Sequence, residues 1–64
     1  MKGDMDNLAI QVKELDRLIQ AMRRLVDELH DKAGGIQAVE RNLDRISANL
    51  KMLEINVSDV RDLL

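Results

Sequence analysis

The chain has 64 residues, 10 Lys and Arg against 12 Asp and Glu, one histidine, and no cysteine, proline or aromatic residue. Such a short chain forms one domain, residues 1–64, and buries little surface when it folds alone, so it needs further stabilisation. Disulfides and thiolate metal sites are excluded, which leaves oligomerisation. The formal net charge of −2, with both signs interspersed, gives no overall field for nucleic acid or an anionic membrane.

The first half of the chain carries apolar residues at alternating steps of three and four, from Met1 to Leu29. This spacing is the heptad signature of helices that pack side by side. The segment Lys2–Asp6 is polar and is expected to be flexible, so the first helix is predicted over about residues 6–33. Its end is indicated by Gly34, which readily adopts the left-handed conformation that closes helices.

The heptad phase changes at Gly34 and Gly35. Carried forward, the first run gives Ala33 and Ile36 and would then require an apolar residue at the position of Glu40, whereas the second run starts a new phase at Ile36 and Val39. One residue of slip is a rotation of about 100° around a helix. The sequence therefore predicts a turn at Gly34 and Gly35 and a second helix over about residues 36–64. Because the two lengths match, the predicted fold class is all-α, an antiparallel helical hairpin.

The apolar stripes are wider than an isolated helix pair requires. Leu18 and Leu25 lie beside the main heptad rows, which is typical of bundles of three or four helices. Two hairpins that dimerise into a four-helix bundle satisfy this width. The predicted oligomer core consists of Leu8, Val12, Leu15, Leu18, Ile19, Met22, Leu25, Val26, Leu29, Ile36, Val39, Leu43, Ile46, Leu50, Leu53, Val57 and Val60.

The expected function is that of a non-enzymatic oligomerisation or protein-interaction module, whose partner is a second copy in a homodimer, with a tetramer as the alternative. Met52 and Ile55 lie off the main stripe and provide a possible contact for another helical protein. No cofactor or metal is expected, because aromatic residues are absent and only one histidine is present. No apolar run is long enough to span a membrane, so a cytoplasmic location is the default expectation.

One short motif offers a chemical alternative. Residues 28–31, Glu-Leu-His-Asp, with a glycine three residues later, resemble the phosphoacceptor box of sensor histidine kinases. The resemblance implies a phosphate on His30, with Asp31 as the assisting base, on a dimeric four-helix unit. In that family the helix continues through the glycine, whereas here the heptad phase breaks. A histidine in the last turn of a helix also interacts favourably with the helix dipole, which requires no chemical role.

A second resemblance is to the helical motifs of membrane-fusion SNARE proteins, through the heptads and the segment Leu43–Ile46, Leu-Asp-Arg-Ile. Such motifs keep one register over their whole length, and this chain does not.

RNA binding by one helix face is the remaining alternative. It rests on Lys13, Arg17 and Arg24, between which Glu14 and Asp16 are interleaved.

The sequence contains two further polar patterns. Asn42, Asn49 and Asn56 recur every seven residues beside the second stripe. They are either boundary residues or hydrogen-bonding residues that fix the register between helices. Arg23 and Asp27 lie four residues apart and are expected to pair on a solvated helix surface.

Overall fold

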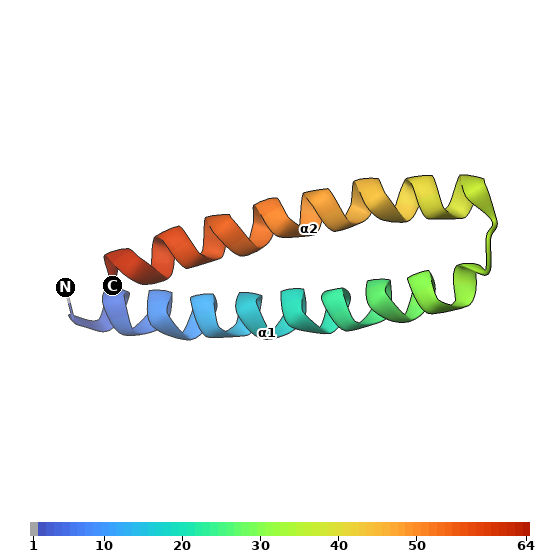
Figure 1. Ribbon diagram of the computed structural model, residues 1–64. Helices are drawn as coiled ribbons and strands as arrows, with labels where there is room; N and C mark the ends of the chain where they lie inside the picture. The colour runs from blue at the N-terminus through green and yellow to red at the C-terminus, as the bar shows by residue number, and fades with distance from the viewer. Residues whose placement is uncertain (1) are drawn as a thin grey trace.

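The computed structural model describes residues 2–64, with side chains from residue 7 onward, and within this part the chain forms two helices. Helix α1 spans Lys2–Ala33, and helix α2 spans Gln37–Leu63. They run antiparallel along a rod whose Cα atoms extend 52 × 15 × 12 Å, so the start of α1 lies beside the end of α2 (Figure 1). The predicted all-α helical hairpin is confirmed.

Helix α1 begins earlier than the sequence suggested. The segment Lys2–Asp6, which was expected to be flexible, is helical in its backbone. It contains no proline that would stop a helix, and acidic residues near a helix start are favoured by the helix dipole. Met1 and the side chain of Met5, which belong to the first heptad run, lie outside the described residues.

The turn lies at the two glycines that mark the change of heptad phase. Gly34 has φ of 57° and Gly35 has φ of 86°, both in the left-handed region that favours glycine. The Ile36 N–H donates to the Ala33 carbonyl at 3.0 Å, and the Glu40 N–H donates to the Ile36 carbonyl at 3.0 Å, which starts α2. The chain therefore reverses its direction over the three residues between the helices, Gly34, Gly35 and Ile36.

The helices pack through one row of side chains each, which we call the hairpin core. Its seven buried members recur every seven residues in each helix, and they are Val12, Ile19, Val26 and Ala33 of α1 with Leu43, Leu50 and Val57 of α2. Seven residues are close to two helical turns, so each row runs nearly straight along its helix. Among the described side chains, no polar or charged residue is buried.

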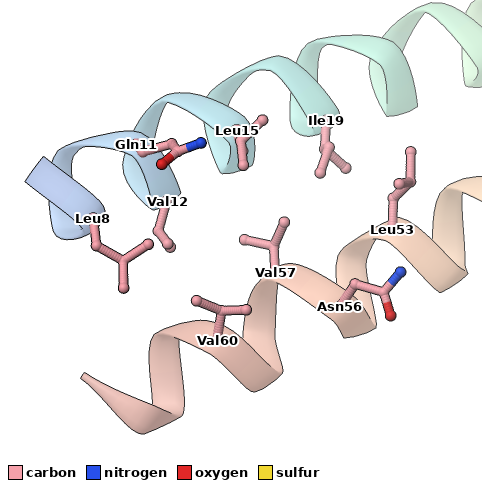
Figure 2. A pocket seen from close by; sticks show the side chains of 9 residues that line it. All are labelled: Leu8, Gln11, Val12, Leu15, Ile19, Leu53, Asn56, Val57 and Val60. Carbon is pink, nitrogen blue, oxygen red and sulfur yellow. The ribbon is translucent and has the colours of Figure 1, made fainter.

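The tight turn also determines which residues lie at the same level along the rod. Ala33 and Ile36 are hydrogen-bonded across it, and from there the helices run in opposite directions with a rise of about 1.5 Å per residue. Residues whose numbers add to about 69 are therefore level with each other. By this rule Val12 lies beside Val57, and Figure 2 shows their side chains pointing toward one another.

A chirality test at Gly35 checks the turn. L-Alanine there should lower the free energy of unfolding by about 1–2 kcal/mol, because L-residues are strained at positive φ. D-Alanine, placed by chemical synthesis, should raise it by about 0.4–1 kcal/mol by restricting the unfolded chain. The Cβ of an L-residue at Gly35 meets no atom within 4 Å, so the loss expected for L-alanine comes from the backbone and not from a steric clash. Urea denaturation measures both effects, and equal effects of the two enantiomers would contradict the left-handed turn.

Candidate interaction surface

One side of the hairpin core is lined by exposed apolar side chains, each three residues after a core position or its heptad equivalent. Three residues rotate a side chain by about 60° to one side of its helix, and in antiparallel neighbours these sides coincide. We call this set the apolar face, and its members are 37–51 % exposed. They are Leu8, Leu15, Met22 and Leu29 of α1 with Val39, Ile46, Leu53 and Val60 of α2.

A groove runs along this face between the first half of α1 and the second half of α2. Leu8 and Leu15 line one wall, and Leu53 and Val60 line the other. Figure 2 shows these side chains in the space between the two helices, and the only polar side chains among the lining residues are those of Gln11 and Asn56. The hairpin core is therefore covered incompletely from this side, and a partner with apolar side chains could complete the packing.

The opposite side of the hairpin core is polar. Five of the seven residues that lie four positions after a core residue are half-buried. They are Asp16, Arg23, His30, Ser47 and Glu54, which we call the polar face. Arg23 Nη2 donates to Glu54 Oε1 at 2.6 Å and to the Ser47 carbonyl at 3.4 Å. Gln20 Nε2 donates to Glu54 Oε2 at 3.5 Å. This side is closed by bonds within the hairpin and offers little apolar surface to a partner.

Glu54 is the charged centre of the polar face. The hydrogen bond from Arg23 holds the pKa of Glu54 below its ordinary value of 4.5, although desolvation opposes the shift. The side chains of Arg23 and Glu54 are 26 % and 30 % exposed, so water screens part of their attraction. Arg23 thus pairs across the hairpin, and the pairing with Asp27 expected from the sequence is not among the ion pairs of the described residues.

Two further rows border the apolar face, each one residue before a core position. On α1 this row contains Leu18 and Leu25, which are 49 % and 60 % exposed. On α2 it contains the exposed Asn42, Asn49 and Asn56. The two border rows therefore differ in chemistry. The row on α1 is apolar at its centre, whereas the row on α2 consists of three asparagine side chains, which we call the asparagine column.

The residues predicted as oligomer core separate into two groups. Six are buried inside the single hairpin, namely Val12, Ile19, Val26, Leu43, Leu50 and Val57. The other eleven are exposed, namely the eight residues of the apolar face, together with Leu18, Leu25 and Ile36. Ala33 is buried although it was not predicted, and its place seven residues after Val26 was the available signal.

His30 lies on the polar face, where its Nε2 is 3.4 Å from Ser47 Oγ. Helix α1 ends at Ala33, three residues further on, and Asp31 is exposed. Across the described residues, no group of three His, Cys, Asp or Glu side chains is arranged to hold a metal ion. Met52 and Ile55 are 57 % and 43 % exposed on α2, away from the apolar face.

Comparison with models of protein families finds no match, and comparisons with curated proteins and with solved structures also find none. Neither helix, over the described residues, is long and apolar enough to cross a membrane.

Arg23 and Arg24 provide a matched test of the polar face. Arg23→Gln should bring the pKa of Glu54 back toward 4.5, whereas Arg24→Gln changes an exposed neighbour and should leave it lowered. Because the folded pKa is below the unfolded one, the stabilisation is present above pH 4.5 and is lost as the pH falls through the folded pKa. An NMR titration of the Glu54 carboxyl carbon measures the shift, and equal responses to both variants would contradict the assignment.

Proposed function

We propose that the protein is a self-associating helical hairpin that forms a homodimeric four-helix bundle and thereby tethers or spaces what is joined to it. The observation that carries this proposal is the apolar face: eight aliphatic side chains lie on one side of a packed hairpin and remain 37–51 % exposed. Contiguous apolar surface of this kind marks interaction sites in proteins. A second copy provides the same aliphatic surface and would bury both faces at once.

The solvent-accessible surface area of the hairpin supports an interface with a second copy of the chain. A compact monomer of 7.3 kDa exposes about 4,200 Å² by the usual scaling of surface with mass. The hairpin exposes 5200 Å². A stable protein interface buries about 800 Å² on each partner, which is close to this excess. Dimerisation would therefore bring the exposed surface per chain near the value of a compact protein.

The other functions considered from the sequence receive less support. For phosphotransfer, His30 would have to present a ring nitrogen to a kinase, whereas its Nε2 lies toward Ser47 within the hairpin. For RNA binding, a basic stripe is required, whereas Arg17 Nη2 bonds Glu14 Oε2 at 2.9 Å on the exposed surface. Self-association alone accounts for the whole apolar face, and it requires no chemistry at His30 and no basic stripe.

Leu53 and Ile55 offer a matched pair of variants, because both are 43 % exposed on α2 and only Leu53 lies on the apolar face. Sedimentation equilibrium should give twice the chain mass of 7.3 kDa for the unmodified protein. Leu53→Asp should weaken the dimer by at least about 3 kcal/mol, more than a hundredfold in Kd, because it places an unpaired carboxylate in the interface. Ile55→Asp should leave the mass unchanged.

A monomeric unmodified protein at millimolar concentration would contradict the proposal. The proposal would also be contradicted if Ile55→Asp dissociated the dimer while Leu53→Asp left it intact, because the interface would then lie on the other surface of α2.

A further inference from the structure

The geometry points to one relative orientation of the two hairpins: the dimer is antiparallel, with the turns at opposite ends, α1 against α1 and α2 against α2 of the second copy. This inference rests on the proposed self-association. It is carried by the placement of Leu18 and Leu25 on one border of the apolar face and of the asparagine column on the other.

Two symmetric arrangements can stack one apolar face on another. If the twofold axis runs along the rod, the turns lie at the same end and each α1 packs against the second copy's α2. If the axis runs across the rod, the turns lie at opposite ends and each helix packs against its own copy. In both arrangements all neighbouring helices are antiparallel, so the helix dipoles do not distinguish between them.

The border rows do distinguish between them, because a residue one position before the hairpin core points almost directly at the facing helix. With the axis along the rod, Leu18 and Leu25 would point at α2 of the second copy, in the part of that helix that carries Asn42, Asn49 and Asn56. Their amides would then lie against leucine side chains, and a buried amide without a hydrogen-bond partner is costly. With the axis across the rod, leucine meets leucine and asparagine meets asparagine. An asparagine amide both donates and accepts, so it can pair with its own copy.

The leucine pair on α1 and the asparagine column on α2 have their centres at nearly the same height along the rod, so a single twofold axis across the rod can serve both. Leu18 and Leu25 are centred between residues 21 and 22 of α1, and the asparagine column is centred on Asn49. The numbers of residues at the same level along the rod add to about 69. The middle of the leucine pair is therefore level with a point between residues 47 and 48 of α2. The two centres differ by about 2 Å at the helical rise per residue. One axis therefore places Leu18 opposite Leu25 of the second copy, and Asn49 opposite itself.

One like-charge approach accompanies this arrangement. Glu14 comes level with Glu28 of the second copy on the outer rim, where both side chains are exposed. Lys32 of that copy lies four residues from its Glu28, lines a groove with it, and comes within one turn of Glu14. The lysine therefore offsets the repulsion, and the rim is solvated.

The chain has no cysteine, so single-cysteine variants report the orientation without interference. In the antiparallel dimer, Asn49→Cys should form an intermolecular disulfide under mild oxidation, because this position lies near the axis with its own copy on the adjacent helix. Asn42→Cys is the matched control and should not, since it lies opposite Asn56 of the second copy. In the alternative orientation the two α2 helices are diagonal, and neither variant should cross-link.

Nitroxide labels at Lys32→Cys, one residue before the core residue Ala33 and therefore directed toward the second copy, give an independent distance beside the turn. They should lie about 33 Å apart along the rod in the antiparallel dimer, and within about 15 Å if the turns share one end. A dimeric mass with labels within 15 Å and no Asn49→Cys disulfide would overturn this inference and leave the proposed self-association standing. A monomeric mass for the unmodified chain would instead overturn the self-association itself.

Discussion

The structure depends on the packing of one heptad row from each helix against the other. Every buried side chain among the described residues belongs to these two rows, and each row advances by seven residues. One row is enough to align two helices and too little to enclose either of them. The surfaces that the hairpin presents to its surroundings depend on the side chains that lie on the two sides of this contact.

The two sides differ because of a one-residue difference in spacing. Aliphatic residues occupy the positions three after the core rows, and polar residues occupy the positions four after them. On the polar side, Arg23 and Glu54 join the helices by a bond of 2.6 Å. On the apolar side, Leu15 and Leu53 remain 42 % and 43 % exposed. A hairpin that is closed on one side and open on the other has one defined apolar surface, on which we propose that a second copy packs.

Much of this arrangement could be predicted from the sequence, because hydrophobic spacing and glycine are strong local signals. The helices, the turn and the breadth of the stripe follow from heptads and from Gly34 and Gly35. The division between buried Val12 and exposed Leu15 could not be predicted, since both are heptad positions and only the rotation of α1 toward α2 separates them. Likewise, Arg23 has Asp27 within reach on its own helix, and its pairing with Glu54 depends on the level of α2.

The central claim is that the apolar face is covered in solution by a second copy. Relaxation of methyl groups by a soluble paramagnetic agent tests it most directly, because Leu53 and Ile55 are equally exposed, 43 % each, in the single hairpin. At high protein concentration the Leu53 methyl groups should be protected and those of Ile55 should not, and dilution should remove the difference. Equal relaxation of both residues at every concentration would contradict the account.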